Sequence, residues 1–179
     1  MNQTAKLFLI YTQIQTHHPE QVYYLQKAKE QNSIICLGTG SGKTYISIML
    51  FKEFGRQLKR DGKKAIFLSP TVVLAQQQSQ EIMKHTNFRV KALYGSLGVD
   101  AWSKETWEEE INSAHILVLT PDLGYRILSK KFIDIRRISV LVVDECHHAG
   151  LKVKPGSKSK FSSSRFRNST NSLLISNNL

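Results

Sequence analysis

Short apolar runs alternate along the chain with segments whose apolar residues recur every three or four positions. The first segment with helical spacing is 20–31, where Val22, Leu25 and Ala28 fall along one side. This alternation predicts an α/β fold, a parallel sheet with helices on both faces. Further helices are predicted over 45–59, 71–85, 103–111 and 122–129. The apolar runs have the length of buried strands and cover 34–37, 65–68, 88–94, 116–119 and 139–143.

Candidate functional loops follow four of the predicted strands. In parallel α/β sheets such loops gather at the carboxyl ends of the strands, where ligands bind. The sequence therefore predicts a site at this edge of the sheet. The four loops are Gly38–Thr44, Ser69–Thr71, Thr120–Pro121 and Asp144–His147.

The first loop has the composition of a phosphate-binding loop. Its glycines allow the backbone amides to approach phosphate oxygens closely, and the following helix directs its amide-rich end at them. Lys43 would add a positive charge, and the Thr44 hydroxyl would be a ligand of Mg²⁺. A glycine-rich turn without function is the alternative, and Leu37, where a strict phosphate loop has glycine, argues against a kinase or GTPase type. The predicted ligand is ATP with Mg²⁺, bound by Gly38, Thr39, Gly40, Ser41, Gly42, Lys43 and Thr44.

An acidic pair ends the last predicted strand. Asp144 would hold Mg²⁺, directly or through water, and Glu145 would act as the general base on the attacking water. Alone, such a pair is usually a solvated turn. Because it follows a candidate phosphate loop by about a hundred residues, it supports the prediction of an ATP site. The following Cys146, His147 and His148 could suggest a metal site or a cysteine nucleophile. Adjacent residues rarely reach one ion together, so neither alternative is favoured.

Composition and charge narrow the class of partner. The 179 residues carry a net charge of +11, which favours a polyanionic partner, nucleic acid ahead of a membrane surface. The excess is uneven: 151–179 contribute six basic residues and no acidic one. No apolar run reaches membrane-spanning length, and the two cysteines lack a CxxC spacing. We therefore expect an intracellular protein of the cytoplasm or nucleus, with no membrane contact.

The final segment changes character. Residues 150–179 are rich in Ser, Lys and Asn, and this composition predicts a disordered basic tail. The sequence thus divides into a lead-in over 1–19, an ATP-binding domain over 20–149 and this tail. On this division the sheet would lack its last strand and leave an exposed edge.

Four motifs occur in order and together resemble superfamily 2 helicases. They are GTGSGKT (38–44), SPTVVLAQQ (69–77), TPD (120–122) and DECH (144–147). The DECH form resembles the Dicer and innate immune RNA-sensor branch. Similarity to the Dicer-like ribonuclease III family extends over roughly 20–149. The resemblance implies an incomplete RecA-like lobe of the P-loop NTPase class.

The resemblance also implies roles for single residues. Lys43, Asp144 and Glu145 would be catalytic, and Gln21 would read the adenine. Double-stranded RNA would be the partner in RNA interference, with double-stranded-RNA-binding proteins as further partners. The structural alternatives are helix capping by Thr71, a helix-opening turn at Thr120 and a solvated surface at Gln76. The implied contacts to the RNA backbone are Thr71, Gln76, Thr120 and Pro121.

The resemblance predicts limits as well. No motif of a second motor lobe and no ribonuclease segment follows residue 148. We expect this chain to bind ATP and RNA backbone, with little hydrolysis of its own. The alternatives are a non-catalytic nucleotide- or RNA-binding fragment and the lobe of a related immune RNA sensor.

Overall fold

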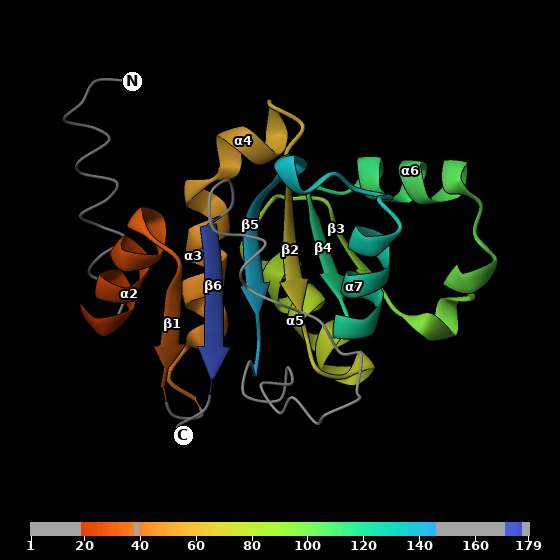
Figure 1. The fold of residues 1–179 in the computed structure, drawn as a ribbon. Helices are drawn as coiled ribbons and strands as arrows, with labels where there is room; N and C mark the ends of the chain where they lie inside the picture. The colour runs from red at the N-terminus through yellow and green to blue at the C-terminus, as the bar shows by residue number, and fades with distance from the viewer. Residues whose placement is uncertain (1–18, 38–39, 146–170, 177–179) are drawn as a thin grey trace, which may run out of the picture.

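A computed structural model describes residues 19–37, 40–145 and 171–176. Its strands form one six-stranded, fully parallel sheet in the order β1-β6-β5-β2-β4-β3 (Figure 1). The predicted fold class is therefore confirmed. The strands are β1 (Ser33–Cys36), β2 (Lys64–Leu68), β3 (Val90–Leu93), β4 (Ile116–Leu119), β5 (Ile138–Val143) and β6 (Asn171–Ser176).

Helices cover both faces of the sheet. One apolar cluster unites α2, α3, α4 and α5 with one face, and a second unites α6 and α7 with the other. Within β2, Ala65 and Phe67 enter the first cluster whereas Ile66 and Leu68 enter the second, as the period of two in a strand requires. Short 3₁₀ turns occupy 95–97, 99–101 and 135–137. The helices are α2 (Pro19–Glu30), α3 (Lys43–Glu53), α4 (Gly55–Lys59), α5 (Val72–His85), α6 (Lys104–Ser113) and α7 (Pro121–Ser129).

The predicted helix starts agree with local capping chemistry. Thr71 Oγ1 accepts a hydrogen bond from the Leu74 amide at 3.2 Å. Ser103 caps α6 in the same way through Thr106. Pro121 occupies the first turn of α7, where its missing N–H costs nothing. The predicted helix over 45–59 is in fact two helices, because the chain bends at Phe54.

The expectation for the final segment is wrong for 171–176. This stretch is β6, which pairs in parallel with both β1 and β5 inside the sheet. It therefore fills the position at which a strand was expected to be missing. Residues 173–175 are apolar, but polar residues surround them, so the average composition of 150–179 does not predict a strand there. Backbone pairing on both sides, which composition does not report, gives this short run its place. Residues 146–170 and 177–179 lie outside the described part.

The buried amine of Lys64 gives a test of the fold by pH. Its Nζ donates to the carbonyl oxygens of Asn112 and Ala114 at 3.1 and 2.6 Å. Burial, with Arg137 and Arg89 nearby, lowers the pKa of Lys64 from 10.5 to about 8. Between these values the unfolded chain holds a proton at Lys64 that the folded chain has lost, so stability rises with pH.

We therefore expect the free energy of unfolding of the wild type to rise, relative to that of Lys64→Met, from pH 8 to pH 10.5. Urea titrations of both proteins across this range measure the difference. Other titrating groups are shared by the two proteins and cancel. Parallel pH profiles would contradict the lowered pKa.

Candidate functional site

The phosphate-loop candidate connects β1 to α3. Gly40 and Gly42 have φ angles of +81° and +80°, which glycine adopts without strain. Gly42 is the N-cap of α3, and no side chain caps this end within the described residues. The positive end of the α3 dipole is therefore directed at this loop, where it would favour an anion. Gly38 and Thr39 lie outside the described residues.

Gln21 of α2 contacts this loop. Its Nε2 donates to the Ser41 carbonyl oxygen at 3.2 Å, and the side chain is 8% exposed. A Cβ at position 42 would lie 2.2 Å from the same Nε2, so a side chain there would displace the Gln21 amide, and the φ of +80° favours glycine in any case. The structure thus places Gln21 against the phosphate loop, and its predicted contact with adenine stays a prediction.

Lys43 and Thr44 begin α3. The Lys43 ammonium donates to the Leu37 carbonyl oxygen at 2.8 Å, which holds it back over the loop. Lys43 and Thr44 are both half-buried. The two side chains thus lie in the first turn of the helix, as the motif requires.

Asp144 and Glu145 follow β5 at the same edge of the sheet. The Asp144 amide donates to the Leu68 carbonyl oxygen at 2.9 Å, and Asp144 Oδ1 accepts from the Glu145 amide at 3.0 Å. Glu145 has a φ of +49°, an uncommon value for a residue other than glycine. Burial, followed by the Glu145 carboxylate, raises the pKa of Asp144, while the Glu145 amide and Lys43 act to lower it.

The order of the strands explains why the phosphate loop and the acidic pair, Asp144 and Glu145, lie near each other. One strand, β6, lies between β1 and β5 (Figure 1), so the two carboxyl ends are separated by two strand spacings, about 10 Å. The Lys43 charge acts on the Asp144 carboxyl across this gap. A phosphate between them would meet the ammonium, the helix amides and, through a cation, the carboxylate.

The residues assigned to RNA contact also lie at this edge. Leu68 and Leu119 are paired in register, so Thr71 and Thr120 follow two adjacent strands. Thr71 caps α5 as described, whereas Thr120 makes no side-chain cap within the described residues. Gln76 is exposed, but its Nε2 donates to the Tyr94 hydroxyl at 2.8 Å. Pro121 is half-buried beside Thr120.

Ser69 belongs to the candidate loop Ser69–Thr71, but the sequence assigned it no role of its own. It is fully buried at the end of β2, and its Oγ has no hydrogen-bond partner among the described residues. Its amide donates to the Leu119 carbonyl oxygen at 2.9 Å. A serine after a strand is common in turns, so no local signal could have found this buried hydroxyl.

Two absences hold for the described residues. They contain no cluster of three or more His, Cys, Asp or Glu side chains fit to hold a metal ion. In that same part of the chain, no helix has the length and apolarity needed to span a bilayer. Cys146, His147 and His148 lie outside it.

Comparison with known proteins shows similarity to helicases. The model of the DEAD/DEAH box helicase family matches residues 12–177. The helicase domain of Pyrococcus furiosus Hef has a similar structure, with a TM-score of 0.70 and 25% sequence identity. The similarity covers 92% of this chain and 34% of that one.

Curated relatives include Dicer proteins of plants and animals. Endoribonuclease Dicer homolog 2 of Arabidopsis thaliana is 42% identical over 133 residues, which cover 74% of this chain and 10% of that protein. Endoribonuclease Dicer of Gallus gallus is 36% identical over 145 residues, which cover 78% of this chain and 8% of that protein. The chain therefore spans about a tenth of the length of these relatives.

Proposed function

Since the chain belongs to the DEAD/DEAH box helicase family, we propose that it binds Mg·ATP at the carboxyl edge of its sheet and serves as the ATP-binding lobe of a Dicer-like protein. One observation carries this proposal. The first turn of α3, the Lys43 ammonium and the Asp144 carboxyl lie at one edge of the sheet, and the Lys43 charge opposes the rise that burial causes in the pKa of Asp144.

The residues present fit a magnesium ion. Carboxylate and hydroxyl oxygens are the ligands this ion prefers, and Asp144 and Thr44 supply them. Burial and the charge of the neighbouring Glu145 carboxylate raise the pKa of Asp144. A divalent cation beside these two carboxyl groups would stabilise their charged forms. The ion would neutralise charge on the phosphate oxygens during hydrolysis.

The chain's own groups would divide the remaining work. Lys43 and the α3 amides would bind and orient the phosphates. Glu145 would accept a proton from water as general base, and Gln21 would contact the adenine while it supports the loop. We further propose that Thr71, Gln76, Thr120 and Pro121 contact the backbone of double-stranded RNA. Amides and hydroxyls of this kind recognise phosphate and the 2′-hydroxyl without reading bases.

Titration with a fluorescent ATP analogue tests the nucleotide site on the full chain. We expect saturable binding that unlabelled ATP displaces and that weakens when EDTA removes Mg²⁺. In Thr44→Ala we expect the difference between Mg²⁺ and EDTA to shrink, because one proposed ligand is lost. A folded chain without displaceable binding would contradict the proposal. Mg²⁺-dependent binding without turnover would favour the non-catalytic alternative.

A further inference from the structure

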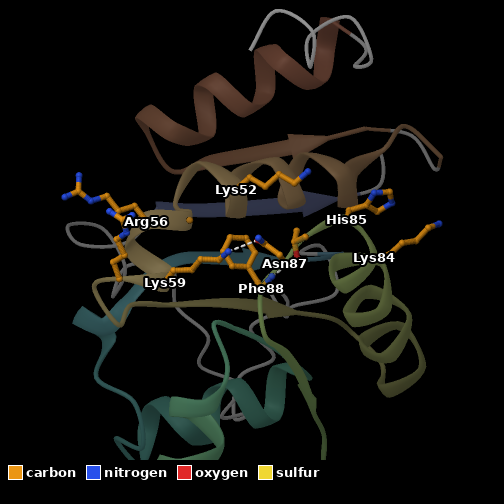
Figure 2. Close-up of a pocket in the computed structure, with 10 residues that line it drawn as sticks. Lys52, Arg56, Lys59, Lys84, His85, Asn87 and Phe88 are labelled. Carbon is orange, nitrogen blue, oxygen red and sulfur yellow. Dashed lines mark hydrogen bonds between the residues drawn. The ribbon is translucent and has the colours of Figure 1, made fainter. Parts of the chain in front are cut away.

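A basic pocket lies beside α3 (Figure 2) and extends from the carboxyl end of this helix to His85, whose ring lies 5.7 Å from that of Tyr45 in the first turn of α3. It is a cavity of about 800 Å³ between the carboxyl ends of α3 and α5, with α4 and the residues before β3 completing its wall. In Figure 1, α4 lies at the end of the strands away from the arrowheads. On α3 itself, the first cation of the pocket is Lys52, which follows Lys43 by nine residues, about 14 Å along the helix axis. Its five cations are Lys52, Arg56, Lys59, Arg60 and Lys84.

The charges of this pocket are not neutralised internally. No carboxylate is among its lining residues, and within the described part of the chain none of its five cations forms an ion pair. Two carboxylates on the same helices contact other side chains than these five cations: Glu53 pairs with Lys29, and Glu81 contacts the lining residue His85, both at 2.7 Å. The pocket therefore presents excess positive charge to solvent.

The floor of the pocket is fixed by packing. Phe88 is 9% exposed, and Gly55 lets α4 approach it, because a Cβ there would lie 3.3 Å from Phe88 Cζ. Lys59 Nζ donates to Asn87 Oδ1 at 2.7 Å and lies 5.0 Å from the centre of the Phe88 ring. Figure 2 shows Lys52, Arg56 and Lys59 around one side of Phe88 and Lys84 on the other.

Helix dipoles offer a structural explanation for some of these cations. The carboxyl end of a helix carries about half a negative charge, and three helices end here, giving at most about −1.5. Five positive side chains exceed this by more than three charges. The field also reaches neighbouring groups: beyond burial, Arg89 and then Lys64 and Lys59 lower the pKa of His115, whose ring contacts Phe88. Capping alone therefore does not account for the cluster.

The chemistry of the lining selects the class of ligand. Protein partners usually insert apolar or aromatic anchors into matching apolar pockets, but here the one aromatic lining residue is nearly buried. Interfaces with nucleic acids are more polar and strongly positive, and most of their contacts reach phosphate. We propose that the basic pocket binds the phosphodiester backbone of RNA, independently of base sequence and separately from the nucleotide site.

The test compares two full-length variants with equal charge. The pocket variant carries Lys52→Gln, Arg56→Gln and Lys84→Gln, three exposed positions that make no side-chain hydrogen bond among the described residues. The control variant carries Lys104→Gln, Lys130→Gln and Lys131→Gln, which are exposed near α6 and α7. Anisotropy of a fluorescein-labelled RNA duplex, without nucleotide and at several salt concentrations, gives the affinities.

We expect the pocket variant to bind RNA about tenfold more weakly than the control, with a salt slope smaller by up to about 2.7 for three lost phosphate contacts. Equal affinities would overturn the proposal, as would equally tight pocket-dependent binding of a polyglutamate peptide. Repeating the comparison in a Lys43→Ala background separates the two sites, since loss of ATP binding leaves this difference unchanged. Chemical acetylation of the wild type tests the site without any substitution. We expect RNA to protect Lys52 and Lys84 from acetylation but not Lys104. Equal acetylation at these positions with and without RNA would also overturn it.

Discussion

Replacement of Lys43 by alanine is expected to weaken Mg·ATP binding by roughly 10- to 100-fold. The ammonium would form charge-assisted hydrogen bonds to phosphate, and such bonds are worth about 1.5–3 kcal/mol each. Lys43 is half-buried at the first turn of α3, where the helix amides also direct positive charge at the ligand. Displacement titrations with a fluorescent ATP analogue measure the loss.

Lys104→Ala is the matched control for this prediction. It removes the same charge from a side chain that is 70% exposed at the start of α6, on the other face of the sheet. We expect its nucleotide affinity to stay within about twofold of the wild type, because exposed charges at a distance are screened by salt. Equal affinities of Lys43→Ala and Lys104→Ala would show that the phosphates bind elsewhere.

Replacement of Trp107 by alanine is expected to remove about 3–5 kcal/mol of folding stability. This side chain is 2% exposed in the apolar cluster beneath α6 and α7. Its ring stacks on Phe132 with centroids 5.2 Å apart and meets Trp102 edge to face at 4.9 Å. The free energy of unfolding of a typical domain is about 5–15 kcal/mol, so this loss would leave the protein marginally stable.

Urea unfolding followed by circular dichroism measures this effect without depending on tryptophan emission. Tyr125→Ala is the control, since Tyr125 is an aromatic residue of α7 that is 42% exposed. We expect it to cost less than about 1 kcal/mol. Similar losses for the two variants would mean that the second apolar cluster is not tightly packed.

The family and the fold class followed from local features of the sequence. Each strand that the sequence predicted is present, although the run 88–94 forms a strand only over Val90–Leu93. The spacing of Lys43, Thr44 and Asp144 along the chain placed all three at strand ends or helix starts. Periodicity and glycine placement are properties of a few consecutive residues, so they can be read without knowledge of the fold.

The order of the strands was not readable in this way. β6 is the last strand in the chain, yet it lies between β1 and β5. Its pairing partners lie more than a hundred residues away in one case and about thirty in the other, so composition around 171–176 could not reveal them. The contact of Gln21 with Ser41 likewise depends on how α2 packs against α3.

The sequence by itself therefore determined the parallel α/β class, the phosphate-loop candidate and the acidic pair, because each is encoded in a short segment. The tertiary structure alone decided which of these segments become neighbours. It brought the phosphate loop and Asp144 to one edge with β6 between their strands, and it gathered residues at the carboxyl ends of α3, α4 and α5 into a basic pocket. Such neighbours arise when distant apolar faces are buried together, and a local pattern carries no record of that choice.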